Sequence, residues 1–264
     1  MLISTSRDGN FDVSSRTWLV HGGAEVAQWS MFGADDRLHA GAMMSYGWGS
    51  SDGLAAGNPY RADSDTQGVS VGLYGTWYQN DESRLGWYTD LWGQYGWFSN
   101  HVDGQALPSV SYDSRVLALS AETGYAWLPS KSLDWVVEPQ AQVIWVRGSQ
   151  DGIVETNGTQ IGDFRGSGWI SRLGVRVHRT WIDEKGNRTQ PYLTLNWWHD
   201  AVNDQLAFNG LLMRDLYPQD RYEIKLGVDV QRRKGWSGWG NVGWEFGSQS
   251  YHAFTGRLGV KYTW

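Results

Sequence analysis

The chain has 264 residues, a net charge of −6 and 18 Trp. The acidic balance disfavours nucleic acid as a partner, because proteins that bind phosphate backbones present basic surfaces. No apolar run approaches the ~20 residues that a membrane-spanning helix needs, so a helical membrane protein is excluded. The many Trp instead favour a protein with a long boundary between apolar and aqueous surroundings.

The first predicted element is Leu2–Arg7, which we interpret as the outer half of a shortened first strand, followed by an external loop at 8–14. The opening Met-Leu-Ile-Ser lacks the charged and apolar regions of a signal peptide. A longer precursor is therefore expected.

Eleven further segments alternate apolar and polar residues, as strands do when successive side chains turn to opposite faces. In the first of them, Trp18, Val20 and Val26 share one parity, whereas His21 and Glu25 share the other. In chain order the segments are 17–29, 37–48, 67–79, 84–98, 111–128, 133–147, 168–182, 190–200, 222–233, 239–246 and 254–264.

Connections of two lengths separate the segments. Short polar turns occur at 32–36, 80–83, 129–132, 183–186 and 234–237, and they alternate with polar stretches at 49–65, 99–108, 148–165 and 201–218. This rhythm is typical of a transmembrane barrel with short periplasmic turns and long external loops. A soluble all-β domain with a similar number of strands is the alternative.

Aromatic residues near both ends of the segments, such as Trp87 and Trp97, favour the membrane barrel because they resemble interfacial girdles. The predicted fold is all-β, a transmembrane antiparallel up-and-down barrel of 12 strands whose first strand is truncated at the N-terminus. Strands of ~12 residues exceed the ~9–11 that cross a bilayer, so we expect them to project from it. Twelve strands predict a bore of ~10 Å, the diameter of one helix.

The polar parity places charged residues in the lumen, where they escape the cost of ~2–4 kcal/mol that a charge incurs at the lipid midplane. The predicted lumen-facing charges are Glu25, Asp90, Glu122, Glu138, Arg172, Arg176, Glu223, Lys225, Asp229, Glu245, Arg257 and Lys261. Acids favour the earlier strands and bases the later ones, so opposed walls are expected to attract across the lumen. Two interpretations stay open: the charges hydrate the pore and pair with one another, or they line a path for a polypeptide. Glycines of the same parity, such as Gly41, Gly124 and Gly227, are expected to keep the bore open.

Motifs for catalysis are absent from the sequence: there is no GxSxG elbow, HExxH or P-loop. The dipeptides Asp35-Asp36 and His199-Asp200 are expected to be solvated surface. We therefore predict no catalytic residue, no metal site and no cofactor.

The terminal strand directs Leu258, Val260, Tyr262 and Trp264 to one face and Arg257 and Lys261 to the other. Together with the segments VHGGAEVAQW (20–29), GVSVGLYGTW (68–77), YTDLWGQYG (88–96), SAETGYAW (120–127) and WVVEPQAQVIWV (135–146), it resembles the C-terminal β-domain of autotransporters, most closely the diffuse-adherence adhesin subgroup. The most specific pieces are the EPQAQ strand, residues 172–177 and the terminal Tyr-Thr-Trp.

This resemblance implies a single domain over residues 1–264, a bacterial outer-membrane barrel that carries its own N-terminal passenger, an adhesin, to the cell surface and anchors it there. It also implies that the barrel-assembly machinery reads the terminal aromatic strand, that outer-membrane lipid and lipopolysaccharide surround a monomeric barrel, and that the barrel is not an enzyme. The passenger and the linker helix that normally plugs the lumen are not expected in residues 1–264. Some family members cleave the passenger with acidic lumen residues; Glu25, Asp90 and Glu138 are the candidates, and no such site is assigned.

Two alternative functions differ in class. A general diffusion porin would carry no passenger, and an outer-membrane barrel enzyme would gather acids and His at the loop-proximal strand ends. The interpretation of His21 and His39 as mid-strand residues disfavours the enzyme.

Overall fold

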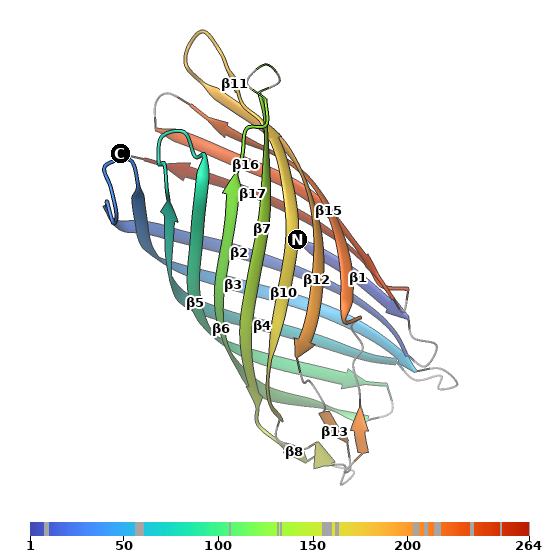
Figure 1. The fold of residues 1–264 in the computed structure, drawn as a ribbon. Helices are drawn as coiled ribbons and strands as arrows, with labels where there is room; N and C mark the ends of the chain where they lie inside the picture. The colour runs from blue at the N-terminus through green and yellow to red at the C-terminus, as the bar shows by residue number, and fades with distance from the viewer. Residues whose placement is uncertain are drawn as a thin grey trace.

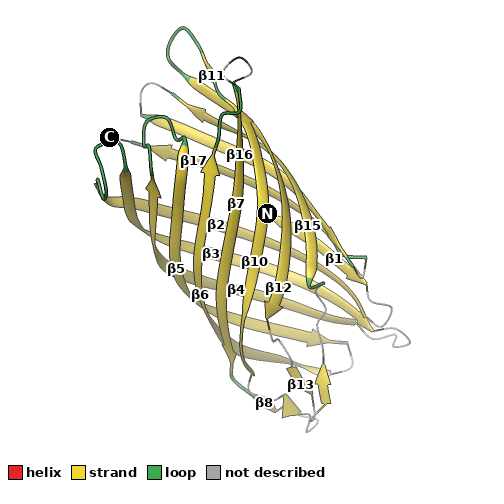
Figure 2. Ribbon diagram, in the orientation of Figure 1, coloured by secondary structure: helices red, strands yellow, loops and turns green. Residues whose placement is uncertain are grey.

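The computed structural model describes residues 1–7, 11–55, 61–105, 107–130, 132, 134–154, 160–161, 164–202, 206–208, 211–213, 218–232, 235–248 and 250–263. These residues form strands joined by turns, and they wind into one tilted barrel (Figures 1 and 2). Within the described ranges, no helix is long and apolar enough to cross a membrane.

Twelve strands close the barrel, and consecutive strands lie side by side and antiparallel. Pairing of β10 with β12 completes the ring, and β11 is a two-residue extension against the start of β12. The predicted all-β, 12-stranded up-and-down barrel is thus confirmed. The twelve barrel strands are β1 (Leu2–Arg7), β2 (Phe11–Trp29), β3 (Arg37–Ala55), β4 (Arg61–Tyr78), β5 (Gly86–Gly104), β6 (Leu107–Ala126), β7 (Trp135–Gln150), β10 (Phe164–Arg179), β12 (Arg188–Val202), β15 (Asp220–Gln231), β16 (Trp236–Gly247) and β17 (His252–Tyr262); the extension β11 is Trp181–Ile182.

The wall has apolar side chains outside and polar side chains inside, the reverse of a soluble domain. Most of the 18 Trp are exposed, and Leu73 and Leu226 are 69% and 55% exposed. The buried side chains are mainly polar or charged, among them Glu223, Arg172 and Glu138. A soluble protein rarely exposes such a continuous apolar surface, so the outer wall is suited to lipid.

The strands are longer than the alternating segments indicate. β5 and β6 have 19 and 20 residues. Residues 49–55, 61–65 and 99–104, predicted as external loop, instead continue β3, β4 and β5 as paired strands. These extensions have water on both faces, so no apolar periodicity marks them.

The external loops also contain strands of their own. β8 (Ile153–Val154), β9 (Gln160–Ile161), β13 (Leu206–Phe208) and β14 (Leu211–Met213) form a separate four-stranded sheet. Phe208 pairs with Ile161, so this sheet joins the connection after β7 to the connection after β12. It lies beyond the barrel end opposite the short turns (Figure 1).

β1 is short, as predicted, and it pairs with both β2 and β17. Residues 11–14, predicted as part of the first loop, lie in β2; residues 8–10 lie outside the described part of the chain. The ladder between β1 and β17 ends where Met1 and Gly256 exchange backbone hydrogen bonds of 2.9 Å. Between this point and the short turns, no pairing joins β2 to β17 among the described residues. We call this stretch, which includes residues 256–262 of β17, the seam; Leu258 there is 90% exposed.

Glycines on the inner wall provide room for neighbouring aromatic rings. A Cβ atom on Gly41, Gly124 or Gly227 would collide with the ring of a Tyr on an adjacent strand. At these three positions the space above the glycine is therefore filled by a ring from the next strand. An aromatic ring lying over a glycine instead stabilises the register of the two strands.

Candidate functional site

The centre of the inner wall is the guanidinium group of Arg172, on β10. Every guanidinium nitrogen has a partner: Nη2 lies 2.8 Å from Glu122 Oε2, Nε donates to Gln142, and Nη1 donates to both Gln140 and Asn196. The partners come from β6, β7 and β12, so three neighbouring strands converge on one side chain. Arg172 is only 7% exposed, and this full set of acceptors is what a buried charge requires.

A second charged group continues the network on β15. Lys225 lies 3.0 Å from Glu223 Oε1, and the other carboxylate oxygen of Glu223 accepts hydrogen bonds from Asn196 at 2.6 Å and Trp198 at 3.3 Å. Asn196 therefore connects the Arg172 group to the Glu223 group, since its amide oxygen accepts from one and its amide nitrogen donates to the other.

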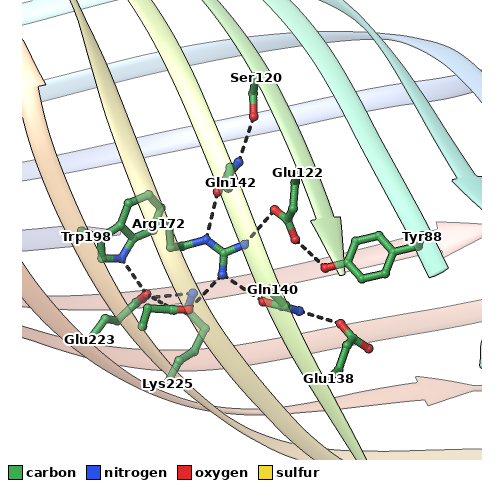
Figure 3. A network of polar contacts seen from close by, with 11 residues as sticks. Tyr88, Ser120, Glu122, Glu138, Gln140, Gln142, Arg172, Trp198, Glu223 and Lys225 are labelled. Carbon is green, nitrogen blue, oxygen red and sulfur yellow. Dashed lines mark hydrogen bonds and ion pairs between the residues drawn. The ribbon is translucent and has the colours of Figure 1, made fainter. Parts of the chain in front are cut away.

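The opposite end of the network reaches β5. Tyr88 donates a hydrogen bond of 2.7 Å to Glu122, and Gln140 donates one of 2.6 Å to Glu138. Figure 3 shows these side chains meeting on the inner wall, with dashed contacts running from Tyr88 to Lys225. The network crosses β5, β6, β7, β10, β12 and β15, six consecutive strands and half of the barrel wall.

Separate pairs connect other predicted charges. Arg176 lies 2.6 Å from Asp229, with its guanidinium group 4.1 Å from the centre of the Tyr192 ring. Glu25 lies 3.5 Å from Lys261 and 3.1 Å from His39, so it joins the two edges of the seam. His39 lies two residues from the start of β3, near a short turn, and not at mid-strand as interpreted from the sequence.

Four predicted residues have fewer contacts. Asp90 accepts a hydrogen bond of 2.5 Å from Thr76, and Glu245 accepts one of 3.4 Å from Tyr251. Glu138 lies 3.9 Å from His178. Arg257 is exposed and forms no ion pair with a carboxylate of the described residues.

These charges pair with residues on nearby strands and not, as expected, with residues on the opposed wall of the lumen. Arg172 and Glu122 are two strands apart, and so are Arg176 and Asp229. Strands separated by one neighbour are ~10 Å apart, a distance that two long side chains can bridge, whereas the full lumen is wider.

Sequence reasoning missed the neutral members of the network, Gln140, Gln142, Asn196, Tyr88 and Trp198. Gln140 and Gln142 share the parity of Glu138 within the EPQAQ segment, and that alternation was the available signal. An isolated Asn or Trp on a polar parity carries no comparable signal.

The acid dipeptide in the β2–β3 turn has a structural role. Asp36 is 4% exposed, so the expectation of solvated surface is wrong for it. It accepts hydrogen bonds from the backbone N–H groups of Met31 at 2.9 Å and Phe32 at 2.6 Å, and from Trp77 at 3.0 Å. Burial alone raises the pKa of an aspartate, but these donors outweigh it and hold the pKa of Asp36 below its usual value.

The second dipeptide is also engaged in local contacts. His199 lies 3.0 Å from Asp220, and Asp200 accepts a hydrogen bond from the backbone N–H of Val202. Among the described residues, no group of three or more His, Cys, Asp or Glu side chains is arranged to hold a metal ion.

The terminal strand exposes Leu258, Val260 and Tyr262 on the outer surface, at 90%, 80% and 49%. Trp264 lies outside the described residues. Arg257 and Lys261 have the opposite parity, and Lys261 reaches Glu25 across the seam.

Comparisons with known proteins agree with this architecture. A family model described as the autotransporter β-domain matches residues 3–243. The uncharacterized protein YuaQ of Escherichia coli K12 is 36% identical over 270 residues, which cover 97% of this chain and 19% of YuaQ. The autotransporter adhesin AIDA-I of Escherichia coli is 29% identical over 213 residues, covering 76% of this chain and 17% of the adhesin.

Among solved structures, the transport unit of AIDA-I from Escherichia coli superposes with a TM-score of 0.85 at 25% identity, covering 100% of this chain and 88% of that one. The chain thus spans less than a fifth of the length of YuaQ and of the AIDA-I adhesin. The closed barrel, the polar inner wall and the match over residues 3–243 show that the chain belongs to the autotransporter β-domain family, whose barrels lie in the bacterial outer membrane.

Proposed function

We propose that residues 1–264 form a single translocator domain that exports its own N-terminal passenger through the hydrophilic lumen and then anchors it at the cell surface. The observation that carries this proposal is the continuous polar network from Tyr88 to Lys225 on the inner wall. The similarity to an autotransporter adhesin supports an adhesin as the passenger.

The network suits passage of a polypeptide for a physical reason. An unfolded chain exposes both apolar and polar groups, and it would adhere to an apolar wall or to an unpaired charge. Here Arg172 and Glu223 are already satisfied by neighbouring side chains, so they offer a passing chain little net attraction. Water remains the better partner for the moving chain.

We further propose that the barrel is a monomer without catalytic activity, and that the barrel-assembly machinery recognises the terminal strand through Leu258, Val260, Tyr262 and Trp264. Three of these side chains are exposed on the outer wall of the edge strand, where another protein can reach them during insertion.

The export function is tested with the precursor that carries its passenger. In the double variant Glu138→Ala/Arg172→Ala, surface display of the passenger is expected to fall severalfold, because Glu122 and three amide oxygens lose their partner and become adhesive sites. Display is measured by antibody labelling of intact cells, and folding by the heat-dependent shift in gel mobility.

The matched control is Glu184→Ala/Lys185→Ala, which removes one acid and one base from an exposed turn. It should display normally. A folded Glu138→Ala/Arg172→Ala barrel with unchanged display would contradict the role of the network. Surface display that persists after the whole barrel is replaced by an unrelated anchor would contradict the translocator function itself.

A further inference from the structure

Three arginines gather on the outer wall, at the barrel end that carries the long connections. Arg115 of β6 and Arg165 of β10 both pair with Ser149 of the intervening β7, so they lie in one row two strands apart. Arg147 of β7 lies in the adjacent row, between them. Strand spacing places the outer two backbones ~10 Å apart, and all three side chains are exposed.

These arginines lie just beyond the aromatic girdle. Arg147 is two residues beyond Trp145, and Arg165 is four residues beyond Trp169, both toward the long-connection end. At ~3.3 Å per residue, they are ~7–13 Å along the strand from rings that mark the membrane interface. This is the level of lipid headgroups on the external side.

The three guanidinium groups are available for a ligand. They line a shallow cavity of about 360 Å³ in which Asp151 is the only acid among the described lining residues. None of the three forms an ion pair with a carboxylate that the structure describes. Asp113 lies beside Arg115 in the adjoining cavity, so three arginines face two acids. An excess of clustered guanidinium groups is how proteins recognise phosphate.

An apolar cavity lies directly below, on the same three strands. It measures about 410 Å³ and is lined by Leu119, Ala121, Val143, Trp145 and Trp169, with Ser120. Leu119, Trp145 and Trp169 form one row across β6, β7 and β10, two residues below Arg147. An occupant of both cavities must be anionic at one end and apolar at the other.

The neighbouring part of the wall at the same barrel end has the reverse charge. Asp52, Asp63 and Asp103 lie in one row on β3, β4 and β5, and their parity also faces outward. An anionic headgroup is repelled there, so electrostatics confines it to β6, β7 and β10.

We propose that Arg115, Arg147 and Arg165 bind the phosphate groups of a lipid in the outer leaflet, a phosphorylated glycolipid of the lipopolysaccharide class, whose acyl chains lie against Leu119, Val143, Trp145 and Trp169. The proposal depends on the outer-membrane location and not on passenger export. A barrel can lose lipid binding and still display its passenger, so the lipid-site proposal and the export proposal can fail independently.

The test uses the folded barrel in detergent and two probes, rough lipopolysaccharide and the same lipid stripped of phosphate. Native mass spectrometry gives the dissociation constant for wild type and for the variant Arg115→Gln/Arg147→Gln/Arg165→Gln. The variant is expected to bind the phosphorylated lipid about tenfold more weakly. Removing phosphate from the lipid should weaken its binding to wild type to a similar degree and leave its binding to the variant unchanged.

Arg16→Gln is the matched control, because Arg16 is also exposed outside the same girdle, near Trp18. It is the one arginine among the described residues of its cavity, where Asp65 and Asp113 oppose it. The affinity of the Arg16→Gln variant for the phosphorylated lipid should stay within about twofold of the wild-type affinity. Equal affinities of wild type and triple variant would overturn the proposal. So would inorganic phosphate alone binding as tightly as the lipid, or a wild-type dimer that the triple variant loses, since the occupant would then be a free anion or a second copy.

Discussion

At the scale of single residues, the inner wall depends on complete pairing of buried charges. Arg172→Ala removes a cation and leaves the carboxylate of Glu122 and the amide oxygens of Gln140, Gln142 and Asn196 without their donor. Breaking one side of a buried pair costs about 3–5 kcal/mol, so the free energy of unfolding should fall by that order. Urea unfolding in detergent measures it. Changing Arg84, a half-exposed partner of Asp81, should cost less than about 1 kcal/mol; equal losses for both would contradict this account.

The turn residue Asp36 gives a prediction for pH dependence. Its pKa is below the usual 3.8 in the folded protein, so the folded state binds the proton less readily than the unfolded chain does. The stabilisation is therefore complete above pH 3.8 and is lost as the pH falls through the lower, folded-state pKa. Wild type should unfold at a higher urea concentration than Asp36→Asn near neutral pH, and the difference should shrink in acid. A difference that stays constant as the pH falls below 3.8 would exclude this titration as its cause.

Parity in the sequence predicts which charges face inward but not how they pair. The choice between Glu122 and Glu138 as the partner of Arg172 depends on the register of β6, β7 and β10, and registers shift with turns that carry no strong signal. The neutral partners Gln142 and Asn196 are equally compatible with solvated surface, so only the folded barrel shows that they meet at Arg172.

At the scale of elements, the seam beside β1 is the predicted weak point of a barrel made of residues 1–264 alone. Gly256 forms its backbone hydrogen bonds with Met1. In an antiparallel ladder, successive residues direct their N–H and C=O groups to alternate sides of the strand. The N–H and C=O groups of Leu258, Val260 and Tyr262 therefore point into the seam, whereas those of the odd-numbered residues 257, 259 and 261 point to β16. Unpaired backbone groups are costly next to lipid.

Hydrogen exchange tests the seam residue by residue. Amides of Leu258, Val260 and Tyr262 should exchange faster than their odd-numbered neighbours, and residues 256–262 as a whole should exchange faster than the central strands β5 and β6. Protection of residues 256–262 equal to that of β5 would contradict the prediction. The double variant Glu25→Gln/Lys261→Gln, which removes the ion pair across the seam, should speed this exchange further.

At the scale of the whole molecule, alternation of side chains was sufficient to predict the strand number, the closed topology and the outward face. It failed where the physical contrast between the faces disappears. Residues 49–53 are Gly, Ser and Asp, with no apolar parity, so the pattern predicts a loop although these residues pair as strand. The arginines on β6, β7 and β10 lie at the same end of the barrel, where alternation does not mark them either.

The strand extensions place the exit of the lumen well above the lipid. A strand of 20 residues such as β6 is ~68 Å long, and a tilt of ~40° leaves ~50 Å along the barrel axis. The apolar band of such barrels is ~25 Å tall, so roughly half of the height stands outside the hydrocarbon. Under the proposed export function, a passenger leaving the lumen would therefore emerge clear of the lipid headgroups and begin to fold there.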